Sequence, residues 1–429
     1  MVTRSGKYAL LPAVFALVSF LSHGAKADDH EDLPPYKMLR SLQFVQDQVV
    51  AGDQSAADIQ RFMLGNIDAR LRSADPSVFE NEANVDAALV YAMSGGNPAT
   101  LDYLVARDVN GNFDNRVTDI LRKYFSGKGL LVVRSLSDTA TEYQNKTIGP
   151  YLSLVAGNVL IAKDSVEALK RFDQARLAAP GTIIEEAALR RSLAVAVDKG
   201  MVDRGMGFAE KYTRRFLHSP YASQFADLFV KLVVDHNKDV QQQAIVDILS
   251  FMDEPRRREI YLRIARAAAI AGKSDLALMA AERARQLSGS DSDPFGALAE
   301  FYGGMAALPT DRVSDAARGI DATAGSSLSK RDQALRLAAQ SVAEQIMAPP
   351  DPASLKQVSS PNSISADVHA AAPAGDNPTP QPVSATASRP AATTTKNELQ
   401  DVDPATQSLL STGRSKLDEI DGLLKKEGN

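Results

Sequence analysis

Five acidic and amide side chains have a spacing that could bind a calcium ion. They fit positions one, three, five, seven and twelve of a calcium loop: Asp108, Asn110, Asn112, Asp114 and Asp119. The sixth position of such a loop needs glycine for its sharp turn, but Phe113 stands there and Gly111 comes two residues early. Asn and Asp side chains also stabilise ordinary turns. The pattern therefore favours turn chemistry, with calcium binding as the alternative.

Other catalytic and cofactor signatures are incomplete. Gly272-Lys273-Ser274 resembles the end of a phosphate-binding loop, but Ala267 stands where the first glycine of that loop is required. The histidines form no H-E-x-x-H pair, and no G-x-S-x-G nucleophile motif occurs. The chain has no cysteine, which excludes thiolate nucleophiles and thiolate metal sites. We therefore predict a protein that is not an enzyme and has no catalytic, cofactor-binding or metal-binding residues.

Adjacent carboxylates could act as a general acid and a general base. Glu185-Glu186 and Asp253-Glu254 are examples, and both pairs fall in segments with helical periodicity. Acidic residues on an amphipathic helix usually form its solvated face. We therefore expect both pairs to be exposed.

The sequence has one concentrated basic patch, Arg256-Arg257-Arg258 with Arg263 and Arg266. This patch is either the ordinary charged surface of a helix or an attraction for an acidic partner. The whole chain is mildly acidic, with a formal net charge of −5, which argues against a nucleic-acid partner. It has no Trp and only 6% aromatic residues, few for platforms that stack carbohydrate rings.

Two segments fit one pattern of about 34 residues that is typical of tetratricopeptide helical hairpins. The first comprises Leu152, Val155, Ala156, Val159, Ala168, Phe172, Ala175 and Pro180. The second comprises Tyr261, Ile264, Ala265, Ala268, Gly272, Ala277, Ala281 and Ala284. Small residues at the crossing points let two helices approach closely. Because such a hairpin cannot bury its apolar face alone, we predict an all-α, tetratricopeptide-like solenoid.

The second hairpin positions a candidate binding strip. In tetratricopeptide arrays the inner helix of each hairpin lines a concave groove. The side chains predicted to point into this groove are Leu262, Arg266 and Ile270, and Arg263 lies near its mouth. We expect these four residues to bind an extended or helical partner segment that carries acidic residues.

The N-terminus has the features of a secretory signal peptide, residues 1–27. Arg4 and Lys7 precede an apolar run that ends at Leu21, and an A-x-A pattern follows at Ala25–Ala27. The run has about 14 residues, whereas a transmembrane helix needs about 20, so a retained anchor is the less favoured alternative. We expect no membrane span after signal cleavage.

The rest of the chain divides into three parts. Residues 28–348 are predicted to form the helical-repeat domain, with a helix break at Gly52-Asp53. Within it, Leu130–Val133 could be a short strand or a buried helical segment. Residues 349–403, rich in Pro, Ala and Ser, are predicted to be a disordered linker. Residues 404–429 are predicted to be a C-terminal amphipathic helix, with its apolar stripe at Leu409, Leu410, Leu417, Ile420, Leu423 and Leu424.

Three segments read LPPYKMLRSLQFVQDQVVAGDQSA from Leu33, LVYAMSGGNPATLDYL from Leu89 and FAEKYTRRFLHSPYASQFADLF from Phe208. Together they resemble a known family, the periplasmic motility protein MotC of certain flagellated bacteria. The resemblance implies a periplasmic protein needed for flagellar rotation, which acts on the stator and binds the periplasmic segment of a stator subunit. It assigns no residue a role.

Two other functions stay open at this stage. One is a cell-wall-modifying enzyme. Such enzymes use paired carboxylates in a cleft, usually with aromatic residues that contact the sugar, whereas this sequence shows helical hairpins and few aromatic residues. The other is a general envelope assembly scaffold with similar repeats, although the chain has no cysteine for a lipid anchor. The sequence leaves open the bound partner surface, the stoichiometry, the role of the C-terminal helix, and whether binding regulates torque, energy coupling or only assembly.

Overall fold

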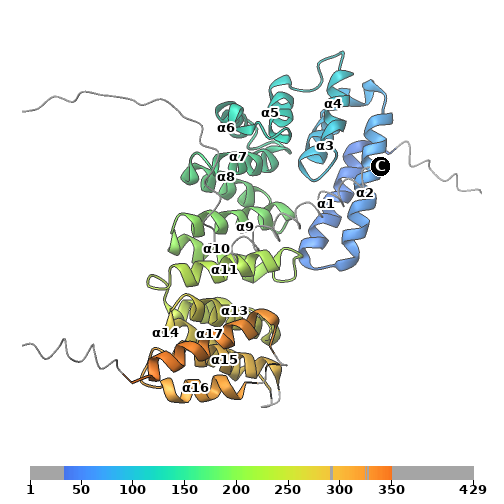
Figure 1. Ribbon diagram of the computed structural model, residues 1–429. Helices are drawn as coiled ribbons and strands as arrows, with labels where there is room; N and C mark the ends of the chain where they lie inside the picture. Colours follow the sequence, from blue (N-terminus) through green and yellow to red (C-terminus); the bar gives the residue numbers. More distant parts are fainter. Residues whose placement is uncertain (1–32, 290–292, 324, 326–327, 350–429) are drawn as a thin grey trace, which may run out of the picture. The chain divides into compact units, whose positions relative to one another are not determined.

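The protein is built from helices. The computed structural model describes residues 33–289, 293–323, 325 and 328–349, and within these ranges it contains no β-strand (Figure 1). The predicted all-α fold class is therefore confirmed for this part of the chain. The predicted signal peptide 1–27, the linker from residue 350 onwards and the predicted helix 404–429 lie outside the described residues.

Short connections join the successive helices. The first group is α1 (Pro35–Ala51), α2 (Gln54–Ser73), the 3-10 helix η2 (Pro76–Glu80), α3 (Glu82–Met93), α4 (Pro98–Ala106), α5 (Asn115–Phe125), the 3-10 helix η3 (Gly129–Val132), α6 (Val133–Glu142), α7 (Gly149–Leu160) and α8 (Ser165–Ala178). The second group is α9 (Ile183–Asp198), α10 (Val202–Arg215), α11 (Ala222–Asp235), α12 (Gln242–Leu249), α13 (Glu254–Ile270), α14 (Ser274–Gln286), α15 (Pro294–Ala307), α16 (Val313–Ala322) and α17 (Lys330–Met347). None of these helices combines the length and the hydropathy needed to cross a bilayer.

The connection between α1 and α2 shows how the sequence sets the helix ends. Gly52 has a left-handed backbone (φ 107°), and its N–H donates to the carbonyl groups of Gln48 and Val49, both at 3.1 Å. Asp53 then caps α2, because its carboxylate accepts a hydrogen bond from the backbone N–H of Ser55 at 2.9 Å. The predicted helix break at Gly52-Asp53 is therefore confirmed.

Both segments that fit the repeat pattern form helical hairpins, α7–α8 and α13–α14. Their patterned helical positions are buried, from Leu152 to Ala175 in the first hairpin and from Tyr261 to Ala284 in the second. In the first hairpin Gly157 lies against the ring of Phe172, where even a methyl group would overlap the ring. The close helix approach predicted from the small residues is thus present.

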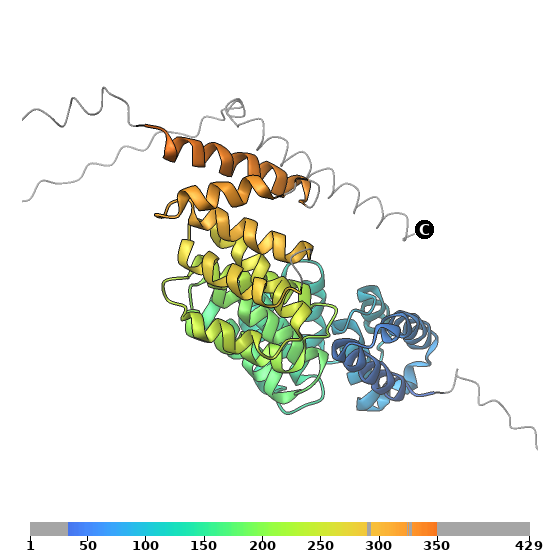
Figure 2. The ribbon, with the colours of Figure 1, turned by 90° about the horizontal axis from the view of Figure 1, so that it is seen from below.

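Neighbouring helices share one apolar core. Buried residues from Leu39 in α1 to Ala343 in α17 belong to a single cluster. Most consecutive helices pack on one another, and around α12 the contacts join alternate helices, α10 with α12 and α11 with α13. The last three helices, α15 to α17, again pack in chain order at the end of the array (Figures 1 and 2). This order is compatible with a tetratricopeptide-like solenoid. α1 departs from nearest-neighbour stacking because it also packs on α9, where Ile183 N donates to Asp47 Oδ1 at 3.1 Å.

The segment Leu130–Val133 is neither a strand nor a buried helix. Its first three residues lie in η3, and Val133 begins α6. Leu130 is 60% exposed and Leu131 is 77% exposed, while Val132 is buried. Val133 is partly buried against the core, so only the second half of this apolar run contributes to the core.

The expected exposure of Glu185-Glu186 is wrong. Both residues are buried, with Glu186 fully inaccessible, because the start of α9 is enclosed by packing against α8, α10 and α11. Arg215 Nη1 donates to Glu185 Oε2 at 2.7 Å. Glu186 Oε1 accepts from Arg190 Nε and from Tyr212 OH, both at 2.9 Å. These hydrogen bonds compensate the two charges, so the pair has a structural role in linking α9 to α10.

Candidate interaction surface

Helix α13 carries the four residues predicted to bind a partner. Asp253 caps this helix, since its Oδ1 accepts a hydrogen bond from Arg256 N at 2.9 Å. The apolar side of α13, which includes Ile264 and Ala268, is fully buried, and the helix packs on α11, α14 and α15. The opposite side carries the basic residues. Each of the four predicted residues has a different environment on this helix.

Leu262 is not open to a groove, in contrast to the expectation from the repeat pattern. Its exposed fraction is only 7%. The reason is that α13 has helical neighbours on several sides, so its buried surface extends beyond the Tyr261–Ala268 side. A partner could reach Leu262 only if these helices separated.

Arg266 is engaged with the last helix of the array. Its Nε donates to Asp332 Oδ1 at 2.9 Å, which joins α13 to α17. Asp332 is itself buried, and its Oδ2 accepts from Ser329 Oγ at 2.6 Å. Burial opposes ionisation of Asp332, but the hydrogen bonds from Ser329, Arg266 and Tyr302 hold its pKa below the usual 3.8. Arg266 therefore has a structural contact that the sequence did not indicate.

Arg263 and Ile270 are the members of the set that are available to a partner. The side chain of Arg263 is about as exposed as that of Arg266, 36% against 35%, but the ion-pair partners of Arg263 are exposed whereas Asp332 is not. Arg263 Nη1 pairs with Asp227 of α11 at 2.9 Å, and its Nη2 pairs with Glu259, one turn earlier, at 2.7 Å. Both partners are exposed, so these ion pairs are weak and exchangeable. Ile270, at the end of α13, is 52% exposed. These two residues can meet a partner without rearrangement of the helices.

The run Arg256–Arg258 does not form one cationic patch. Arg256 pairs with its own capping residue Asp253 at 2.6 Å. Arg258 turns toward the connection between α14 and α15, where it donates to Leu287 O at 3.2 Å and lies over the ring of Phe295. Since consecutive helical residues point about 100° apart, adjacent arginines serve different surfaces.

An apolar pocket of about 150 Å³ adjoins Arg263. Phe225 of α11 and Met252, which precedes α13, line it together with Ile260. Arg256, Glu259 and Arg263 also line it, so two cations and one carboxylate lie beside the apolar surface. Phe225 and Met252 gave no signal in the sequence, because local periodicity does not show which distant helix faces α13. Such a pocket can receive an apolar side chain with a carboxylate nearby.

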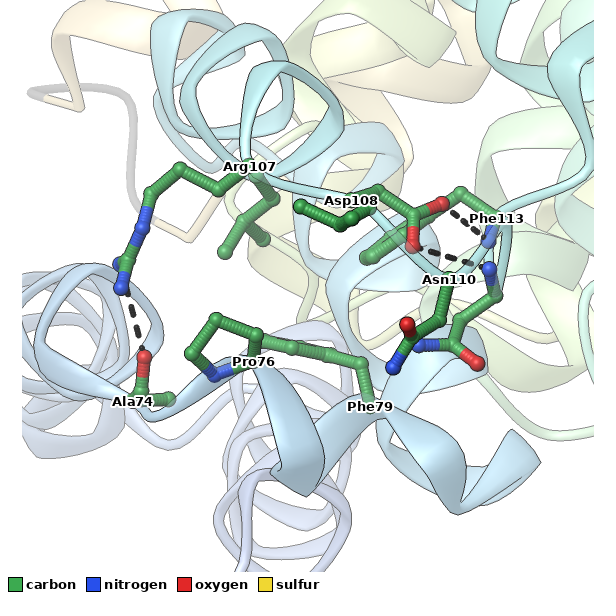
Figure 3. Close-up of a pocket in the computed structure, with 10 residues that line it drawn as sticks. Ala74, Pro76, Phe79, Arg107, Asp108, Asn110 and Phe113 are labelled. Atoms are coloured by element: carbon green, nitrogen blue, oxygen red, sulfur yellow. Dashed lines mark hydrogen bonds between the residues drawn. The ribbon is translucent and has the colours of Figure 1, made fainter.

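The candidate calcium loop is organised by hydrogen bonds within the chain. Asp108 Oδ1 accepts from Asn112 N at 2.9 Å, and its Oδ2 accepts from Phe113 N at 2.8 Å (Figure 3). Asp114 caps α5 and accepts from Tyr143 OH at 2.7 Å. Asp108 thus stabilises the turn and Asp114 caps the helix, as expected if the pattern reflects turn chemistry. Among the described residues, no three His, Asp or Glu side chains gather as a metal site would require.

The Gly272-Lys273-Ser274 segment is a turn between helices. Gly272 has a left-handed backbone (φ 65°), and Lys273 N donates to Ala268 O at 2.8 Å, which closes the end of α13. Ser274 then begins α14. The segment therefore joins the two helices of a repeat hairpin and does not follow a strand, as a phosphate loop does.

Comparison with known proteins places the whole chain in one family. The family described as "Chemotaxis protein MotC" matches residues 1–429. A relative named "Chemotaxis protein MotC" from Rhizobium meliloti (strain 1021) is 51% identical over 427 residues, which cover 97% of this chain and 98% of the relative. No solved structure matches the chain. The family resemblance seen in the sequence is thus confirmed.

Proposed function

We infer the function from one premise, that this chain belongs to the chemotaxis protein MotC family. We propose that it is a non-catalytic periplasmic scaffold required for rotation of the flagellar motor. The observation that carries this proposal is the family match over the full length of the chain. The scaffold would bind the periplasmic segment of a stator subunit and affect energy coupling or stator assembly.

The accessible part of the predicted strip supports a role in binding a protein segment. Arg263 lies beside an apolar pocket, and its present partners Asp227 and Glu259 are exposed. An exposed ion pair contributes about 0–1 kcal/mol, so a partner carboxylate can replace one of them at little cost. Ile270 offers apolar surface on the same helix. The strip we propose for the stator segment is therefore Arg263, Ile270 and this pocket.

Crosslinking from a single cysteine tests the proposed partner. The chain contains no cysteine, so an Ile270→Cys variant has one reactive thiol. Val166→Cys is a matched control, because Val166 lies on α8 and is 50% exposed, against 52% for Ile270. With a thiol-reactive photocrosslinker in swimming cells, we expect a stator-subunit adduct from Ile270→Cys only. Equal adducts from both variants, or none from either, would count against this surface.

Two further measurements test the compartment and the absence of catalysis. Cell fractionation with N-terminal sequencing should find the protein in the periplasm, starting near Asp28. The purified mature protein should show no muramidase or amidase activity on cell-wall material. Release of wall fragments would instead support a cell-wall-modifying enzyme.

A further inference from the structure

Helix α17 is the last helix of the described array, and one of its sides is exposed. It packs on α16, as Figure 2 shows. Ala339 and Ala343 are buried on its inner side, and Gln340 Nε2 donates to Asp321 Oδ1 of α16 at 2.7 Å. These contacts fix which side of α17 faces the array. The opposite side, which we call the outer face of α17, consists of the exposed residues Lys330, Ala334, Leu337, Ala338, Ser341 and Glu344.

The centre of the outer face is apolar. Leu337 is 64% exposed, and every exposed side chain from Gln333 to Val342 is uncharged. The terminal helix of a helical array usually has a polar outer face, because that face meets water. A single exposed leucine is nevertheless common on protein surfaces. What indicates a partner is the arrangement of charges on either side of Leu337.

Two charges of opposite sign flank Leu337 at equal distances. Lys330 lies seven residues before it and Glu344 seven residues after it. Seven residues make almost two helical turns, with a drift of only about 20°, so the three side chains follow one stripe along α17. Among the described residues, neither Lys330 nor Glu344 forms an ion pair or a side-chain hydrogen bond. The stripe is therefore positive at its start, apolar at its midpoint and negative at its end.

We propose that the outer face of α17 binds the same face of a second copy of this chain, with the two helices antiparallel. A two-fold axis beside Leu337 brings the two leucines together and places Lys330 of each copy opposite Glu344 of the other. Every contact then occurs twice, as a symmetric dimer interface requires. The short side chains of Ala334 and Ala338 let the helix axes approach to about 8–10 Å.

The order of the charges selects a second copy as the occupant. An antiparallel copy of the stripe offers a negative charge where the first copy offers a positive one, at the same spacing and around the same apolar contact. Both ion pairs and the leucine contact can therefore form together. One helix from each copy makes a small interface, so we expect a weak dimer that depends on concentration. The dimer goes beyond the proposed function, because the strip of Arg263 and Ile270 takes no part in it.

Analytical ultracentrifugation of the full-length secreted protein tests the association. We expect the sedimentation coefficient to rise with concentration toward that of a dimer. Leu337→Lys should stay monomeric, because two like charges would meet at the two-fold axis. The matched control is Leu177→Lys on α8, where the leucine is 68% exposed, and it should associate like wild type. A monomeric wild type overturns the proposal, and so does equal association of wild type and Leu337→Lys.

Charge exchange tests the antiparallel orientation. Lys330→Glu and Glu344→Lys should each weaken the dimer about 10-fold, because both symmetric Lys–Glu contacts become like-charge contacts. The double variant should recover wild-type association, and so should an equal mixture of the two single variants, since opposite charges again meet across the interface. Glu80→Lys, at the exposed end of η2, makes the same change in charge as Glu344→Lys and should have no effect.

The recovery decides whether the charges act between copies. Circular dichroism checks that each variant is folded. If the single variants weaken association but neither the double variant nor the mixture recovers it, the charges do not face each other and the antiparallel arrangement is wrong.

A cysteine at the centre of the face distinguishes a second copy from other occupants. The chain contains no cysteine, so Leu337→Cys has one thiol. Mild oxidation should link two copies through this residue, because it meets itself at the two-fold axis. Leu177→Cys should stay unlinked. A photocrosslinker attached to Leu337→Cys that joins only to another segment of the same chain, or only to a different protein, shows another occupant and overturns the proposal. Crosslinking from Ile270→Cys is a separate measurement, so the dimer and the stator contact can fail independently.

Discussion

Replacing Arg266 by glutamate should loosen α17 from the array. From the sequence alone this is an exposed charge reversal, which usually changes stability by less than about 0.5 kcal/mol. The structure instead places Arg266 Nε 2.9 Å from Asp332 Oδ1, with side-chain exposures of 35% and 10%. In the variant two carboxylates would face each other, and one of them is nearly buried.

The size of the effect follows from the environment of Asp332. A hydrogen bond to a charged group contributes about 1.5–3 kcal/mol. Partial exposure of Arg266 to solvent reduces this value, while the new like-charge contact adds to the loss. We therefore expect a loss of about 2 kcal/mol, concentrated where α17 begins at its cap Ser329.

Hydrogen exchange measured by mass spectrometry locates the change. In Arg266→Glu the amides of α17 should exchange faster, whereas those of the α7–α8 hairpin should not. Arg263→Glu is the matched control, because its partners Asp227 and Glu259 are exposed and it should behave like wild type. A cycle of Arg266→Gln and Asp332→Asn, singly and together, should show that the two effects are not additive.

The pH dependence of this contact has a defined sign. Because the pKa of Asp332 is lowered in the folded protein, its contribution to stability is present above 3.8 and is lost as the pH falls below 3.8 through the lowered value. The difference in α17 exchange between wild type and Arg266→Gln should therefore shrink in acid. If Arg266→Glu and Arg263→Glu exchange alike at neutral pH, the ion pair does not hold α17 and this reasoning fails.

Three other predictions follow from single positions. Gly157→Ala should destabilise the protein by about 1–3 kcal/mol in denaturant unfolding, because the new methyl group overlaps the Phe172 ring; an unchanged midpoint would show that the hairpin has room. Asp47→Asn should raise the unfolding midpoint at neutral pH, because burial raises the pKa of Asp47 and its charged form therefore destabilises the folded protein. This gain should vanish as the pH falls toward 3.8, where the carboxylate is protonated in both states. A lower midpoint at neutral pH would show that the charge is compensated. Truncation after Met347 should leave cooperative thermal unfolding almost unchanged, because the segment that follows has a composition unsuited to core packing; a loss of several degrees would contradict this.

Local features of the protein were determined by its sequence. The hairpins α7–α8 and α13–α14 could be predicted because small residues recur where helices must cross, and that spacing is a property of neighbouring turns. The helix break at Gly52-Asp53 and the turn around Asp108 could also be read, since both depend on hydrogen bonds between residues a few positions apart. Family membership was recognisable for a different reason, because long segments match.

Contacts between distant helices were decided only by the tertiary structure. Arg266 finds Asp332 66 residues further along the chain, and Ile183 reaches Asp47 across 136 residues. Leu262 was expected to be open and is buried, and Glu186 was expected to be solvated and lies in the core. Periodicity tells which face of a helix is apolar, but it does not tell which other helices will cover its flanks. That depends on how all the hairpins pack together.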